Sequence, residues 1–288
     1  MIRMKSRIIY GLLLGFLGIA IVIFPFTPLP DVAVLAAVLV AVYELMKVFG
    51  VKNKFVYAMS MAFSTLVIAY SGYASRLDFE IPVVPVVTAY IMIMLAIIVV
   101  DFGKTTFNHV ALSMAASFFI PGAVGCYLRI RNLFYDFDGI VTLGHIRFII
   151  WFCLAGAVFA DTFALFVGVK FGKKKLCPRV SPKKTVEGAI GGVIGSAVIN
   201  IIAIFVCNAL CYKPFPIPVP VMIVLSFVLP VISMLGDLIA STIKRNYGIK
   251  DFGNLIPGHG GIMDRIDSIS FVAPFMYGML VILLKIFA

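Results

Sequence analysis

The feature that most constrains the fold of this chain is a series of long apolar segments that continues from its beginning to its end. Each segment approaches the roughly 20 residues that a helix needs to cross a bilayer. Hydrophobic residues make up 62% and charged residues only 13% of the 288 positions, whereas a soluble domain carries about 25% charged residues. The segments lack the alternating pattern of barrel strands. We therefore predict an all-α, polytopic integral membrane protein.

The hydropathy pattern predicts about nine transmembrane helices. The first follows a basic N-terminal segment, ends near Phe26 and is interpreted as a retained helix, not as a cleaved signal peptide. The others are expected at 32–48, 55–73, 82–100, 107–127, 146–170, 188–211, 217–243 and 267–287. The boundary at 128–147 is compatible with an interfacial segment that contains Arg129, Arg131, Asp136, Asp138 and His145.

Basic residues are distributed unevenly between the two ends of these helices. With the N-terminus in the cytoplasm, most of the 24 Lys and Arg residues fall in cytoplasmic segments, as the positive-inside rule requires. We interpret the net charge of +11 in this way and expect no nucleic-acid partner. The five cysteines lack metal-site spacing and are interpreted as packing residues.

Two domains are expected. Residues 1–105 would form a scaffold for lipid or dimer contacts, and residues 106–288 would form the catalytic domain. Within the first, Glu44 lies near the basic end of its span. We interpret it as a snorkelling or ion-paired side chain.

Most polar residues gather late in the chain, at 233–268. Asp237 is seven residues from Lys244, too far for a pair one turn apart, so it requires a partner from elsewhere. Asp264 and Asp267 are three residues apart and share one face at the start of the last helix. Their mutual repulsion favours a bound cation.

The loop before these two acids is rich in glycine. Pro257, Gly258, Gly260 and Gly261 prevent regular structure and let the backbone approach a ligand closely. We interpret His259 as a donor that contacts phosphate or orients the loop, because one histidine is not a metal motif.

A second polar group lies upstream. Asp161 is about 13 Å along its helix from Lys170, and a carboxylate there costs at least about 2.5 kcal/mol unless it faces a cavity, an ion or a partner. Gly168 and Gly172 continue its face and favour close approach of another helix or a ligand. The alternative is an acid with only an internal hydrogen-bonding role.

The segment after this helix predicts a phosphate site. Ser181 is expected to be an N-cap, with Pro182 as the first helical residue. Lys183 and Lys184 would then lie in the first turn, where the helix dipole disfavours cations unless an anion binds. The alternative is a basic cap that only sets orientation. Glu187 would orient a lysine or help to hold a cation.

Asp161, Asp237, Asp264 and Asp267 together supply the hard oxygen ligands that Mg²⁺ prefers. Whether a second cation joins Mg²⁺ is left open. Acids that hold Mg²⁺ beside lysines and glycines that hold phosphates indicate nucleotide phosphoryl or nucleotidyl transfer at the membrane edge.

Two motifs resemble those of the phosphatidate cytidylyltransferase (CDP-diacylglycerol synthase) family. The first reads Ser241-x2-Lys244-Arg245-x4-Lys250-Asp251-x-Gly253-x2-Ile256-Pro257-x-His259-Gly260-Gly261-x2-Asp264-Arg265-x-Asp267. The second comprises Ala160-Asp161-Thr162, Gly168, Phe171-Gly172-Lys173 and Ser181-Pro182-Lys183-Lys184-Thr185-x-Glu187-Gly188. Phe163-Ala164-Leu165 and Val186 depart from residues common in bacterial members. The resemblance covers about residues 150–287.

This resemblance implies an enzyme that condenses CTP with phosphatidate to give CDP-diacylglycerol and pyrophosphate. It implies a Mg²⁺-dependent membrane enzyme that is often dimeric, with Asp237 and Asp264 at the positions of its metal-binding acids. We expect a homodimer and, from the residues themselves, Asp161 as a further metal ligand. We expect the bacterial inner membrane, with the site on its cytoplasmic side. The alternatives are a CTP-dependent lipid kinase of the polyprenol or phytol type, and a membrane transporter with intramembrane acids.

The expected site residues fall into two groups. The catalytic group comprises Asp161, Asp237, Lys244, Arg245, Asp264 and Asp267. The nucleotide- or phosphate-binding group comprises Ser181, Lys183, Lys184, Thr185, Glu187, Lys250, Asp251, His259, Gly260, Gly261 and Arg265.

Overall fold

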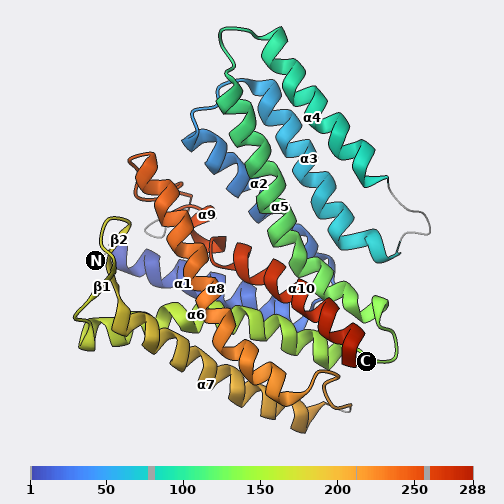
Figure 1. Ribbon diagram of the computed structural model, residues 1–288, viewed down its shortest axis with the longest axis vertical. Helices are drawn as coiled ribbons and strands as arrows, with labels where there is room; N and C mark the ends of the chain where they lie inside the picture. Colours follow the sequence, from blue (N-terminus) through green and yellow to red (C-terminus); the bar gives the residue numbers. More distant parts are fainter. Residues whose placement is uncertain (1, 77–81, 212, 256–259, 288) are drawn as a thin grey trace.

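The computed structural model describes residues 2–76, 82–211, 213–255 and 260–287 as helices joined by short connections, with one small hairpin (Figure 1). Within these ranges, eight helices are long and apolar enough to cross a membrane. The prediction of a polytopic helical membrane protein is confirmed. The expected first span corresponds to α1, whose apolar part, Gly11–Ile23, is shorter than the other eight.

The first half of the chain contains α1 (Ile2–Ile23), α2 (Pro28–Val48), α3 (Lys54–Tyr73), the 3-10 turn η1 (Ala74–Arg76), α4 (Val83–Val100) and α5 (Phe107–Asp136). The second half contains α6 (Leu143–Phe171), β1 (Lys175–Cys177), β2 (Ser181–Thr185), α7 (Val186–Leu210), α8 (Val219–Asn246), α9 (Met263–Ile266) and α10 (Ile269–Phe287).

Two apolar clusters fill the interior. One is formed mainly by α2, α3, α4 and α5, and the other by α6, α7, α8 and α10 together with the end of α5 (Figure 1). Helix α5 therefore connects the two clusters. Ala240, Phe252 and Met263, from the polar 233–268 segment, insert into the first cluster. The polar segment consequently lies where the two halves meet.

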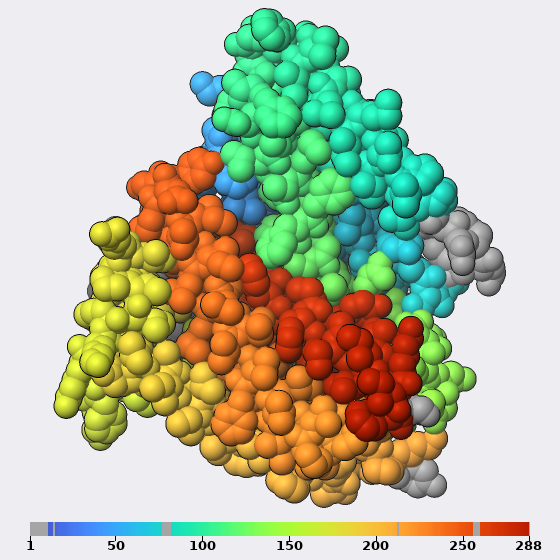
Figure 2. All heavy atoms as spheres, in the orientation of Figure 1, coloured from blue at the N-terminus to red at the C-terminus, as the bar shows by residue number. Residues whose placement is uncertain are grey.

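Contacts between distant loops define one end of the bundle. The Asn53 side chain donates to Asp101 at 2.9 Å, which joins the loops after α2 and α4. The rings of Phe49 and Tyr247 pack with centroids 5.4 Å apart and join the ends of α2 and α8. The hairpin lies beside α8 at this end (Figure 2). Basic residues lie in these loops, among them Lys52, Lys104 and the hairpin lysines Lys175, Lys183 and Lys184. The side of the membrane that they face stays a prediction.

A buried arginine organises the opposite end. Arg131 on α5 is 1% exposed and donates to Asp31 at 2.8 Å and to the Gly72 carbonyl at 3.1 Å. Helix α5 continues to Asp136, so the prediction that this span ends at 127 was wrong. Because Arg131 finds partners on α2 and α3, its charge does not end the helix.

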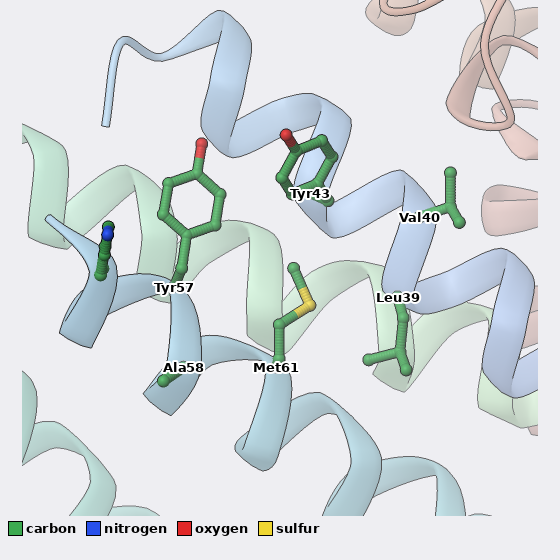
Figure 3. A pocket seen from close by; sticks show the side chains of 7 residues that line it. Leu39, Val40, Tyr43, Tyr57, Ala58 and Met61 are labelled. Carbon is green, nitrogen blue, oxygen red and sulfur yellow. The ribbon is translucent and has the colours of Figure 1, made fainter. Parts of the chain in front are cut away.

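An apolar pocket of about 560 Å³ opens between α2 and α3 (Figure 3). Its lining side chains are Leu39, Val40, Tyr43, Lys54, Tyr57, Ala58 and Met61. Among the described residues, no acid belongs to this lining, whose polar groups are those of Lys54 and the two tyrosines.

We predict that Asp31→Asn lowers the free energy of unfolding by about 3 kcal/mol, because it leaves the buried Arg131 charge without its carboxylate. Asp138→Asn, an exposed acid at the same end, should have little effect. Thermal unfolding of both variants in detergent would measure the difference, and equal stability would contradict the structural role of the pair.

Candidate active site

The stretch predicted to begin a helix at Ser181 forms a strand instead. In β2, Ser181 lies opposite Cys177 of the antiparallel strand β1. Lys183 and Lys184 therefore lie on a hairpin strand and not in a first helical turn. The predicted Ser181 cap was wrong, because pairing with β1 keeps residues 181–185 extended.

Helix α7 begins at Val186, directly after β2, and Thr185 is its N-cap. The Thr185 hydroxyl accepts the Gly188 N–H at 3.1 Å. Glu187 reaches backward, and its carboxylate accepts the N–H groups of Lys173 at 3.0 Å and Lys174 at 3.2 Å. Glu187 thus fixes the basic segment through its backbone and ties the hairpin to the first turn of α7.

Helices α6 and α7 approach closely beside the hairpin. A Cβ atom on Gly168 would lie 3.0 Å from the Thr185 hydroxyl, and one on Gly188 would lie 2.7 Å from the Ala164 carbonyl oxygen. The close approach predicted for the Gly168 and Gly172 face is confirmed, and the neighbour is the start of α7. This packing brings α6, which carries Asp161, next to the strand that carries Lys184.

Acids from α6 and α8 lie close to Lys184. Its ammonium forms an ion pair with Asp237 of α8, which is the partner from elsewhere that Asp237 was predicted to require. Asp161 of α6 lies within electrostatic range of Lys184, Asp237 and Arg265. Asp267 lies within range of Asp161 and Asp237. The two motifs, far apart in the sequence, therefore form one cluster.

Asp264 is the best-connected acid of this cluster. Its side chain is buried, and Oδ1 accepts from the Lys244 ammonium at 2.7 Å. Oδ2 accepts the N–H groups of Phe252 at 2.8 Å and Gly261 at 3.0 Å. The Asp264 carboxylate thereby joins α8 to both ends of the glycine-rich loop.

The loop glycines serve this packing. Gly260 has a φ of +84°, which favours glycine, and a Cβ there would lie 2.9 Å from Asp264 Oδ2. Asp251 lies beside Gly260. His259, with residues 256–258, lies outside the described residues, so its predicted role stays a prediction.

Arg245, at the end of α8, contacts the hairpin. Arg245 donates to the Val180 carbonyl of the hairpin at 3.1 Å and to the Ile249 carbonyl at 3.1 Å. It holds the hairpin against the end of α8. Lys183, Lys250 and Arg265 are exposed.

Glu44 of α2 is a member of this site that the sequence reasoning missed. It is 6% exposed, and its carboxylate accepts the N–H groups of Ile262 at 3.2 Å and Met263 at 2.9 Å. The available signal was an acid inside an apolar span, which is a functional candidate by default. Its nearness to basic residues favoured snorkelling instead.

The donor set fits a hard divalent cation chemically, because it consists of carboxylates that repel one another. The hydroxyls of Ser233, one turn from Asp237, and of Ser268, next to Asp267, are buried and have no hydrogen-bond partner among the residues that the structure describes. Within the described ranges, however, no three Asp, Glu, His or Cys side chains converge closely enough to hold a metal ion by themselves. Any such ion would need further ligands, such as substrate phosphates.

Comparison with known proteins identifies the family. The cytidylyltransferase family model matches residues 5–283. The chain belongs to this family. It is 32% identical over 284 residues to the phosphatidate cytidylyltransferase of Bacillus subtilis, covering 97% of this chain and 98% of the relative.

Two further relatives of the family carry the same name. The phosphatidate cytidylyltransferase of Staphylococcus aureus is 29% identical over 241 residues, covering 83% of this chain and 84% of the relative. That of Haemophilus influenzae is 41% identical over 167 residues, covering 57% and 54%. The family that the motifs resemble is confirmed, and the family match extends through the N-terminal helices.

We predict that Gly188→Ala lowers stability by about 1–3 kcal/mol and reduces activity, because the added Cβ would separate α6 from α7. Gly122→Ala is the matched control, since a Cβ at Gly122 in α5 would meet no described atom within 4 Å outside its own stretch of helix. Unfolding and activity measured for both variants would test this. Equal behaviour of the two would contradict the close α6–α7 contact.

Proposed function

We propose that this protein is a phosphatidate cytidylyltransferase, which condenses CTP with phosphatidate to give CDP-diacylglycerol and pyrophosphate. The observation that carries the proposal is the relationship over 97% of the chain to the Bacillus subtilis protein of that name. The acids and lysines gathered from both motifs support it, because they supply the charges that this reaction needs.

In this reaction, a phosphate oxygen of the lipid attacks the α-phosphorus of CTP. The new P–O bond forms while the bond to pyrophosphate breaks. The second pKa of a phosphate monoester is about 6, so the nucleophile is already anionic at neutral pH and needs no strong general base. The scarcity of histidine, three in the whole chain, agrees with this requirement.

The main barrier is electrostatic, because two anions must meet and a third must leave. We assign the binding of the triphosphate and the lipid phosphate to Lys183 and Lys184 on β2 and to Lys244 and Arg245 at the end of α8. Lys184 is oriented by Asp237, and Lys244 by Asp264. These cations are therefore positioned before substrate arrives.

Mg²⁺ would be held by Asp237 and Asp264, with Asp161 or Asp267 in support. When bound, it supplies positive charge that offsets the charge on the phosphates. Asp237 and Asp264 each contact a lysine, so their oxygens would be shared between the lysine and the ion. This arrangement keeps the oppositely charged groups of the site together.

The protein is an integral membrane protein with bacterial relatives. We place the site on the cytoplasmic side, because the basic residues gather at that end of the bundle and CTP is available there. The apolar helices around the cluster would hold the acyl chains. A homodimer stays a prediction.

Purified protein incubated with phosphatidate, Mg²⁺ and CTP labelled at the α-phosphorus tests the proposal directly. We expect the label in a lipid product, together with an equal amount of pyrophosphate. Label retained in soluble CDP would instead identify a lipid kinase, and transport without nucleotide turnover would identify a transporter.

We predict that Asp264→Asn lowers the rate of CTP-dependent conjugation by at least about 100-fold while membrane insertion is retained. The reason is that Asp264 both orients Lys244 and contributes negative charge to the metal site. Asp136→Asn, an exposed acid at the far end of α5, should retain the wild-type rate. A wild-type rate in Asp264→Asn would refute the assignment.

We also predict that removal of divalent cations with EDTA abolishes conjugation and that added Mg²⁺ restores it. Asp237→Asn should raise the Mg²⁺ concentration needed for half-maximal rate by about 10-fold or more, because one charged ligand is lost. The measurement is rate against free Mg²⁺. Full activity in EDTA would exclude the proposed metal.

A further inference from the structure

Glu44 stands apart from the other polar residues of the site because it comes from the N-terminal half of the chain. It lies on α2, whose other buried residues are apolar apart from a proline, and it is more than 200 positions from the residues that it contacts. A carboxylate buried inside a spanning helix is costly. Its contacts must therefore compensate for that cost.

Those contacts are two successive peptide N–H groups. Oε1 accepts from Ile262 and Oε2 accepts from Met263, the two residues at which α9 begins. The preceding N–H, of Gly261, is bound by Asp264. Three consecutive amides of this turn are thus held by two carboxylates, one from α2 and one from α9 itself.

The chain closes around Glu44 from two sides. A Cβ atom on either Gly253 or Gly261 would overlap the Glu44 carboxylate. Glycine at these two positions lets both sides of the loop approach the Glu44 carboxylate. Glu44 consequently fills the space between the Asp251–Gly253 side and the Gly260–Met263 side of the loop.

We propose that Glu44 is a positioning residue for the cytidylyl transfer: it fixes the Gly261–Asp264 turn so that Asp264 and Lys244 face the substrates. The inference rests on the proposed function. It also gives the N-terminal helices a part in catalysis, because α2 supplies the carboxylate that holds the turn. Glu44 acts through Asp264 and touches no reacting atom.

Glu44→Gln is the first test. The glutamine keeps the length of the side chain, but its amide nitrogen would face a peptide N–H and lose one charge-assisted hydrogen bond. We expect kcat to fall by about 10- to 100-fold, with the KM for CTP changed less than about 3-fold. Glu44→Asp keeps the charge but is one methylene shorter, so it should recover part of the loss. Asp136→Asn is the matched acid-to-amide control and should retain the wild-type kcat.

Gly253→Ala provides a second route if Glu44→Gln folds poorly. Its Cβ should displace the Glu44 carboxylate and lower kcat by a similar factor. In a Glu44→Ala background the space is free, so Gly253→Ala should then have less than about a 2-fold further effect. The proposal would be overturned if Gly253→Ala lowered kcat as much in the Glu44→Ala background as it does in the wild type.

Hydrogen exchange separates failure of this inference from failure of the proposed function. The amides of residues 261–263 should exchange at least about 10-fold faster in Glu44→Gln than in the wild type, whether or not the wild type converts CTP. Unchanged exchange, or a wild-type kcat in folded Glu44→Gln, would overturn the positioning role. Two further outcomes would overturn it: an activity that falls only in proportion to the amount of folded protein, and a raised KM with unchanged kcat.

Discussion

The geometry of the site depends on one buried carboxylate, that of Asp264. Its two oxygens bind the Lys244 ammonium and the peptide groups of Phe252 and Gly261. A buried ammonium or carboxylate that loses its partner costs several kcal/mol, so neither Lys244 nor Asp264 can move away from the other at low cost. Helix α8, the loop and α9 are therefore all joined through this carboxylate.

Helix α8 extends this principle to the rest of the cluster. Asp237 and Lys244 are seven residues apart, which places them on one face and about 10 Å apart along the axis. Asp237 pairs with Lys184 of the hairpin, and Lys244 pairs with Asp264 of α9. Helix α8 thus supplies the acid of one ion pair and the base of the other. It thereby sets the distance between the hairpin and α9. Asp161 and Asp267 lie within electrostatic range of the first pair, and their extra negative charge favours a cation there.

The sequence was sufficient for the elements that obey strong local rules. Hydropathy predicted the spans, the spacing of Asp237 and Lys244 required an outside partner, and Gly168 marked a close approach that the structure contains. The start of α7 was misplaced because Ser181 and Thr185 are both good caps. Only pairing with β1, a tertiary contact, decides for Thr185.

Glu44 was misinterpreted for a related reason. Its partners are backbone N–H groups, which every residue except proline possesses, so no side-chain pattern in the sequence reveals them. Its position near Lys47 also gave a plausible local explanation. Single-sequence reasoning recovers interactions between distinctive side chains, but it cannot recover a carboxylate that binds peptide groups far away in the chain.

The contact between Glu44 and the Ile262–Met263 turn shows that the N-terminal half of the chain also contributes to the site. Both motifs lie after residue 150, so the second half contains the distinctive chemistry. Without α2, however, the N–H groups of Ile262 and Met263 would lose their acceptor, and Phe252 and Met263 would lose the apolar cluster into which they insert. Buried peptide groups without a hydrogen-bond partner are costly. The turn that carries Asp264 therefore depends on a helix that contains none of the motif residues, and the family match over residues 5–283 agrees with a catalytic unit that includes both halves.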